Sequence, residues 1–216
     1  MSKPIETLLP MVLPYAHSCP EIIGIEAIRN AAIEFCERSL WVQEQVPPIT
    51  PIAGTSSYQL IPADPSATDV AEIMHLWLGP RELIASSVDK LADSFGRDWR
   101  TITAAPQYFT TIESQSIVVL APTPDVGATT STLNAIIAIR PLRTATTLSN
   151  DLVERWAEAI AYGARARLHQ IMRQPWYDMP MAVAEQREFR ALIAEATIKR
   201  NKGATREITV VRPRRL

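Results

Sequence analysis

The sequence predicts an α+β fold in which helical N- and C-terminal segments form one bundle, interrupted by a β-rich insertion and followed by an extended tail. Three observations predict it. Helical periodicity of apolar residues occurs only in the flanking segments, the middle is rich in proline and β-branched runs, and the chain ends in a short basic stretch. The expected boundaries are 1–47 and 149–203 for the two helical parts, 48–148 for the insertion and 204–216 for the tail.

The first expected helix begins after Pro20. Charged residues lie mostly off its apolar stripe, as in an amphipathic helix that packs on a core. Since proline cannot continue a helix, we expect Pro47 and Pro48 to end it. The stripe is formed by residues at helical spacing: Ile25, Ile28, Ala32, Phe35, Cys36 and Ser39.

The middle of the chain reads as short strands joined by turns. Residues 73–78 run through Gly79 and Pro80 into residues 82–84, which predicts a hairpin. Residues 108–112 and 117–120 flank a polar turn and predict a second hairpin. A further strand is expected at 133–139, and a short helix capped by Ser86 or Ser87 at 87–95.

Two helices are expected in the last third. Asn150 or Asp151 can cap the first, whose apolar seam continues to Ile171 before Pro175 stops it. The second begins near Pro180 and ends at Gly203, a residue that favours the end of a helix. The amphipathic stripes of the flanking helices have one another as the nearest partners.

Charge is distributed unevenly along the chain. The formal net charge is −1, but residues 199–216 contain seven basic residues and one acid, so this end carries +6 and the rest −7. Such asymmetry indicates a basic tail that meets an acidic partner or nucleic acid. A solvated, disordered end is the alternative.

Glycine spacing excludes the common nucleotide-binding loops. The seven glycines are never closer than 17 residues apart, whereas Walker and dinucleotide loops, and the nucleophile elbow of hydrolases, need them clustered. His17, Cys19 and Cys36 do not form a zinc-ligand pattern. We therefore expect no cofactor and no metal. Two cysteines are too few for a disulfide scaffold, which favours a reducing cytoplasm during folding.

Acidic residues offer the remaining route to catalysis. A general acid needs burial or a neighbouring like charge to raise its pKa, and the paired glutamates are interpreted as exposed helix faces. His169, beside Arg165 and Arg173, is likewise expected on a solvated face. The chain is therefore expected not to be an enzyme, with a hydrolase of unrecognised carboxylates as an alternative. The pairs one turn apart are Glu34 with Glu37, Glu154 with Glu158, and Glu185 with Glu188.

Membrane insertion is not expected. No run approaches the roughly 18 apolar residues that a spanning helix needs. Pro10 and Pro14 interrupt the apolar N-terminal stretch, so it does not resemble a signal peptide.

Several ordered motifs resemble phage head-to-tail connector and adaptor proteins of the tail tubular protein A-like family. Residues 19–39 are similar to the opening helix of that group. The later motifs that carry the resemblance are Pro48-Ile49-Thr50, Ala53-Gly54-Thr55-Ser56-Ser57-Tyr58, Ala105-Pro106-Gln107-Tyr108-Phe109 and Leu120-Ala121-Pro122-Thr123-Pro124.

The resemblance implies a structural protein of the virion, made in the host cytoplasm and located at the head–tail junction. Such a protein forms a homo-oligomeric ring, expected to be a dodecamer, which binds the portal protein above and a nozzle or tube protein below. DNA passes through its channel without specific binding. An acidic body suits that role, because like charge keeps phosphates from adhering.

The tail is the expected portal-binding site. The β-branched centre of residues 204–216 favours an extended strand that a partner's open sheet edge or apolar groove can order. Its arginines can pair with acids on the portal. A nucleic-acid-binding tail is the alternative. The residues assigned to this site are Arg206, Ile208, Val210, Val211, Arg212, Arg214 and Arg215.

Overall fold

The computed structural model describes residues 2–112 and 114–203, and these contain both helices and sheets, which confirms the α+β class. The chain forms two compact units. The helical unit comprises residues 2–41 and 146–203 of the described chain, and the β-rich unit comprises residues 42–145. The expected tail, 204–216, lies outside the described residues.

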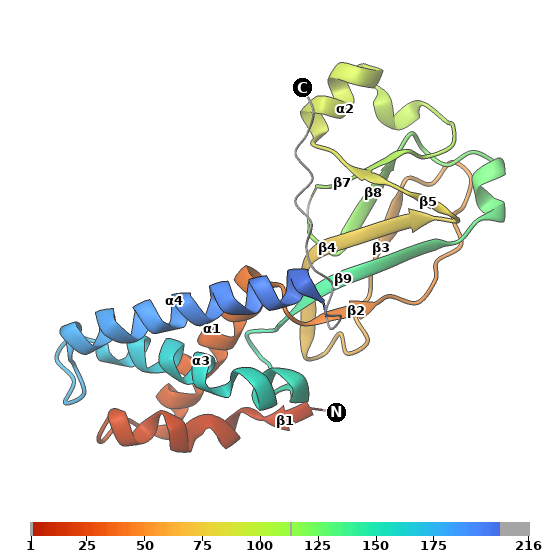
Figure 1. The fold of residues 1–216 in the computed structure, drawn as a ribbon. Helices are drawn as coiled ribbons and strands as arrows, with labels where there is room; N and C mark the ends of the chain where they lie inside the picture. The colour runs from red at the N-terminus through yellow and green to blue at the C-terminus, as the bar shows by residue number, and fades with distance from the viewer. Residues whose placement is uncertain (1, 113, 204–216) are drawn as a thin grey trace. The chain divides into compact units, whose positions relative to one another are not determined.

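The helical unit is built on three long helices that pack on one another in all three pairings (Figure 1). Two short 3-10 helices at the N-terminus pack beside them, and β1 pairs antiparallel with β10. The elements of this unit are β1 (Ser2–Pro4), η1 (Ile5–Met11), η2 (Leu13–Tyr15), α1 (Glu21–Ser39), β10 (Thr147–Ser149), α3 (Asn150–His169) and α4 (Met179–Lys202).

Polar caps fix where α3 and α4 begin. The side chain of Ser149 accepts a hydrogen bond from the Leu152 amide at 3.4 Å, so the cap of α3 is one residue before the predicted Asn150. Asp178 caps α4 by accepting from the Met181 amide at 3.0 Å. Both cap side chains satisfy amides that a helix leaves unpaired at its start.

The predicted end of the first helix was wrong. α1 ends at Ser39, because Leu40 adopts a left-handed conformation with φ 51°. Trp41 then donates its indole N–H to Asp151 Oδ2 at 2.7 Å and meets the Trp156 ring edge-on at 5.2 Å. This contact with α3 directs the chain out of the helix well before Pro47.

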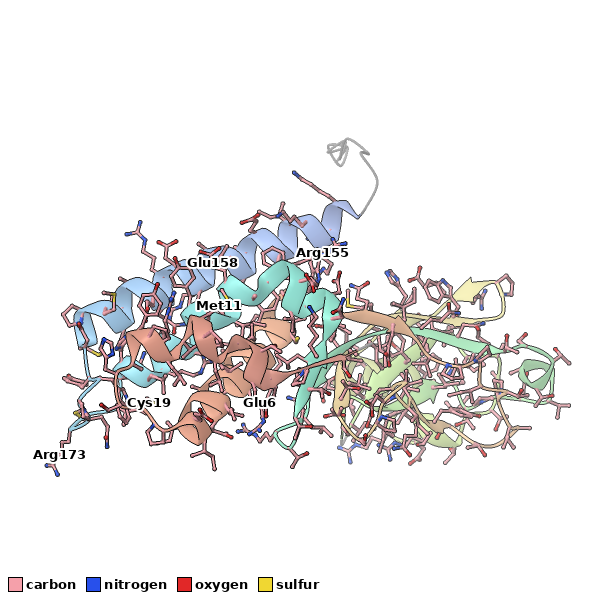
Figure 2. All side chains as sticks on the ribbon, turned by 90° about the horizontal axis from the view of Figure 1, so that it is seen from below. Glu6, Met11, Cys19, Arg155, Glu158 and Arg173 are labelled. Carbon is pink, nitrogen blue, oxygen red and sulfur yellow. The ribbon has the colours of Figure 1, made fainter. Side chains whose placement is uncertain are left out.

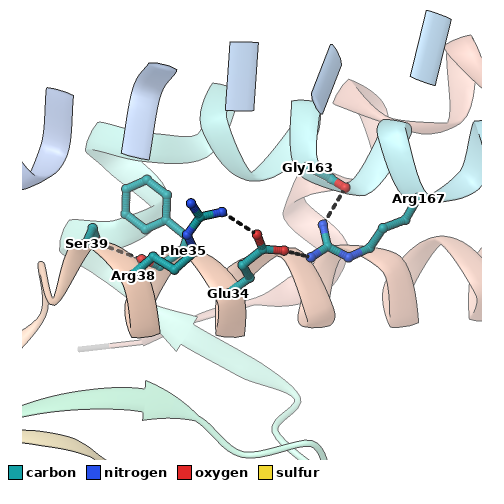
Figure 3. A network of polar contacts seen from close by, with 6 residues as sticks. All are labelled: Glu34, Phe35, Arg38, Ser39, Gly163 and Arg167. Atoms are coloured by element: carbon teal, nitrogen blue, oxygen red, sulfur yellow. Dashed lines mark hydrogen bonds and ion pairs between the residues drawn. The ribbon is translucent and has the colours of Figure 1, made fainter. Parts of the chain in front are cut away.

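α1 and α3 are joined by a polar network shown in Figure 3. Glu34 on α1 pairs with Arg38 at 3.0 Å and with the guanidinium of Arg167 on α3. Arg167 also donates to the Gly163 carbonyl at 2.7 Å. The Arg38 pair lies within α1, so Arg167 is the side chain of this network that links α3 to α1.

The β-rich unit holds two four-stranded sheets, ordered β2-β9-β4-β5 and β3-β8-β7-β6. Both predicted hairpins are present, as the antiparallel pairs β4 with β5 and β7 with β8. Leucine, isoleucine and valine side chains from both sheets share one buried core. The elements are β2 (Gln43–Gln45), β3 (Ser57–Gln59), β4 (Thr68–Leu78), β5 (Arg81–Glu82), β6 (Ile84–Ala85), α2 (Val88–Phe95), η3 (Trp99–Thr101), β7 (Tyr108–Thr111), β8 (Ile117–Ala121), η4 (Gly127–Thr130) and β9 (Leu133–Pro141).

Among residues 2–112 and 114–203, none of the helices combines the length and the apolar character that crossing a bilayer requires.

Candidate functional site

The helical unit contains a buried cluster of charged side chains between α3 and α4. Arg165 Nε lies 2.9 Å from Glu185 Oε1, and His169 Nε2 lies 3.5 Å from Glu185 Oε2. All three side chains are buried. A buried carboxylate is therefore placed between a permanent cation and a titratable imidazole.

Helical spacing and a short turn bring these groups together. Arg165 and His169 are four residues apart on α3, so they share one face of the helix. The chain then turns, and the Asp178 amide donates to the His169 carbonyl at 3.1 Å just before α4 begins. Glu185 lies two turns into α4 and faces back onto α3.

Two aromatic rings lie close to the Arg165 guanidinium. Its centre lies 4.2 Å from the Tyr15 ring and 4.5 Å from the Tyr162 ring, within the range of cation–π attraction. Arg165 also donates to the Met11 carbonyl at 3.4 Å. The N-terminal 3-10 helices are thereby tied to the polar cluster.

The tautomer of His169 is set by its second contact. Nδ1 lies 2.8 Å from the Trp176 carbonyl oxygen, which can only accept, so Nδ1 carries a hydrogen. Nε2 then faces the Glu185 carboxyl group with either a lone pair or a proton. A proton on Nε2 or on Glu185 removes the repulsion between two lone pairs.

Burial raises the pKa of Glu185, the nearby Arg165 and His169 charges oppose that rise, and Asp178 adds to it. The folded chain therefore binds this proton more tightly than the unfolded chain, in which a glutamate has a pKa of about 4.3. The stabilisation from that proton is complete below about pH 4.3 and is lost as the pH rises through the raised pKa.

A test compares wild type with Glu185→Gln in urea unfolding between pH 4 and 8. The stability of wild type relative to the variant is expected to fall as pH rises through the window above pH 4.3. Glu188→Gln controls for loss of a carboxylate from α4. A relative stability that instead rises with pH contradicts the assigned direction.

A pocket of about 570 Å³ opens beside this cluster. Met11 and Glu158, labelled in Figure 2, both line it, as do Arg165 and Glu185. Its walls combine apolar and aromatic side chains with three carboxylates and one arginine. We call it the acidic pocket; its lining is Pro10, Met11, Tyr15, Glu158, Ala161, Tyr162, Arg165, Met181, Ala184, Glu185 and Glu188.

Two sequence interpretations of this region were wrong. His169 is only 5% exposed and Glu185 is also 5% exposed, whereas both were expected on solvated faces. The reason is that α3 is packed by α1, α4 and η1 together, so few of its faces remain free. The sequence signal for burial on several sides is the abundance of alanine in α3, from Ala157 to Ala166, which extends beyond a single apolar seam.

The other candidate ligands lie apart from the cluster. Cys36 is buried on α1, where burial and then the charge of Glu37 raise the pKa of its thiol to about 12. Cys19 is also buried, and burial raises its pKa. His17 is exposed. Within the described ranges, no three His, Cys, Asp or Glu side chains gather closely enough to hold a metal.

All residues assigned to the portal-binding tail lie outside the described residues. They are Arg206, Ile208, Val210, Val211, Arg212, Arg214 and Arg215.

Comparison with known families places the chain among phage adaptors. A family model described as SU10 adaptor protein, a phage head-to-tail adaptor family, matches residues 18–214. The match includes all three long helices, the β-rich unit and most of the tail. No curated protein matches the sequence.

Proposed function

Because this chain belongs to the SU10 adaptor protein family, we propose that it forms a ring beneath the portal of a phage head and joins that portal to the tail. Membership of this family supports a structural role as a phage adaptor. The observation that carries the proposal is the family match over residues 18–214. A family of structural adaptors also supports a role without catalysis.

The ring is expected to be a dodecamer that leaves a channel for DNA, with the portal protein on one side and a nozzle or tube protein on the other. The charge distribution supports this arrangement. The chain up to residue 198 carries a net charge of −7, and an acidic lining lets phosphates slide past without binding.

The tail is the proposed anchor to the portal. Residues 204–216 contain four arginines and one glutamate around a β-branched centre. Such a segment can add a strand or enter a groove on a partner, with its arginines paired to partner acids.

Removal of residues 206–216 is expected to leave both units folded and to abolish attachment to the portal. The described part of α4 ends before the deletion, so no described contact is lost. Loss of one buried charge pair alone costs about 2–5 kcal/mol, so affinity for purified portal rings should fall at least about thirtyfold. Co-sedimentation at physiological salt measures this, with circular dichroism as the check on folding.

A matched variant distinguishes binding through the charge of the tail from binding through its arginine side chains. Replacing the tail arginines by lysine keeps the charge but removes bidentate pairing. If the truncated chain still attaches to portal rings like wild type, the tail is not the anchor. If truncation instead removes only salt-dependent binding to DNA, the alternative of a nucleic-acid-binding tail is favoured.

A further inference from the structure

Two flanks of α4 carry opposite unpaired charge. On the pocket side, Glu188 of α4 and Glu158 of α3 are exposed. Their side chains make no ion pair or hydrogen bond within the described chain. The third pocket carboxylate, Glu185, is already paired with Arg165. The acidic pocket therefore presents two uncompensated carboxylates.

The other flank of α4 is basic. Arg187 and Arg190 are exposed, and neither side chain makes an ion pair or hydrogen bond among the residues that the structure describes. Val183 and Ile198, which are 62% and 54% exposed, share that side of the helix. A helix rotates by about 100° per residue, so Arg187 and Glu188 point to different sides of α4.

The walls of the acidic pocket suit an arginine. Tyr15 and Tyr162 already hold one guanidinium, and Met11 and Met181 add apolar surface for the side-chain stem. A volume of about 570 Å³ leaves room for a side chain together with its neighbours. The two free carboxylates supply the counter-charge that such a guest needs.

We infer that Arg187 and Arg190 of one copy enter the acidic pocket of the next copy, so that α4 supplies both halves of a head-to-tail contact. The occupant is a second copy because one chain carries both complementary surfaces. Two different surfaces in contact make a heterologous interface, which generates a ring when the rotation closes. This inference rests on the proposed function and names the contact that would build the ring.

The test uses two charge-reversed variants. Glu158→Arg/Glu188→Arg makes the pocket basic, and Arg187→Glu/Arg190→Glu makes the other flank of α4 acidic. When either variant is used alone, like charges meet in every contact between copies. The concentration of the variant at which purified portal rings are half loaded should therefore rise at least about tenfold. Mixed in equal amounts, they restore opposite charges at both kinds of contact in an alternating ring. The mixture should load within about threefold of wild type, as measured by mass photometry. Glu6→Arg and Arg97→Glu, exposed elsewhere, are the controls.

A second measurement needs no portal. Arg187→Lys protein, prepared as a mixture of ¹⁴N- and ¹⁵N-labelled chains, is concentrated and treated with a zero-length carbodiimide. Cross-linked peptides that join position 187 to Glu158 or Glu188 and combine both isotopes are expected. Reversed variants that load portals like wild type, or a mixture that does not recover, overturn the contact and leave the adaptor function standing. Mixed-isotope cross-links without portal loading by wild type support the contact and count against the adaptor function.

Discussion

Replacement of Arg165 by methionine is expected to lower the free energy of unfolding of the helical unit by about 3–5 kcal/mol. The substitution leaves Glu185 buried without its cation, and it also removes the contacts of the guanidinium with the Tyr15 and Tyr162 rings. Because Glu185 can take up a proton, the loss should be larger at pH 8 than at pH 5. Hydrogen exchange of α3 and α4 amides measures the loss in this unit alone.

The double variant Arg165→Met/Glu185→Leu is the matched control. It replaces the ion pair by apolar side chains of similar size, a change that is often neutral in a buried site. Most of the stability lost in the single variant should return, although the stacking on Tyr15 and Tyr162 will not. A double variant that is as unstable as the single one would show that packing or the lost His169 contact, rather than the unpaired carboxylate, accounts for the loss.

The sequence predicted the class and most of the elements because their signals are local. Turn residues such as Gly79 and Pro80 mark a hairpin, and the periodicity of apolar residues marks α1. Where the prediction of α1 failed, the cause was not local. Leu40 is not a residue that favours a left-handed conformation, and directly after it Trp41 contacts Asp151 and Trp156, more than 100 residues away.

The charged cluster was hidden for a related reason. When burial is inferred from a single apolar seam, Glu185 and His169 are predicted to lie on the surface. They contact each other because α4 packs against α3 in the folded chain. Tyr15 follows a proline-containing stretch that gave no helical signal, yet η1 and η2 bring its ring onto Arg165. The acidic pocket thus depends on tertiary contacts that no single segment encodes.

The contact of Gly163 on α3 with Phe189 on α4 and Ala31 on α1 gives the second large effect. Phe189 of α4 is fully buried, and its ring lies where a side chain at Gly163 of α3 would begin. A Cβ atom at Gly163 would clash with the Phe189 ring at 2.9 Å and make a tight contact with the Ala31 Cβ at 3.1 Å. Glycine therefore allows this approach without displacing the ring, although it costs helix stability by about 0.5–1 kcal/mol relative to alanine.

Phe189→Ala is expected to destabilise the helical unit by about 3–5 kcal/mol, because it removes a buried ring and leaves a cavity between α3 and α4. Gly163→Ala alone should cost about 1–3 kcal/mol through overpacking. In the Phe189→Ala background the ring is gone, so the same Gly163→Ala change should cost much less or stabilise α3. Ile198→Ala, on the exposed side of α4, should change stability by no more than about 0.5 kcal/mol. Hydrogen exchange of α3 amides measures all four variants, and strictly additive effects of Phe189→Ala and Gly163→Ala would contradict the direct packing of ring against glycine.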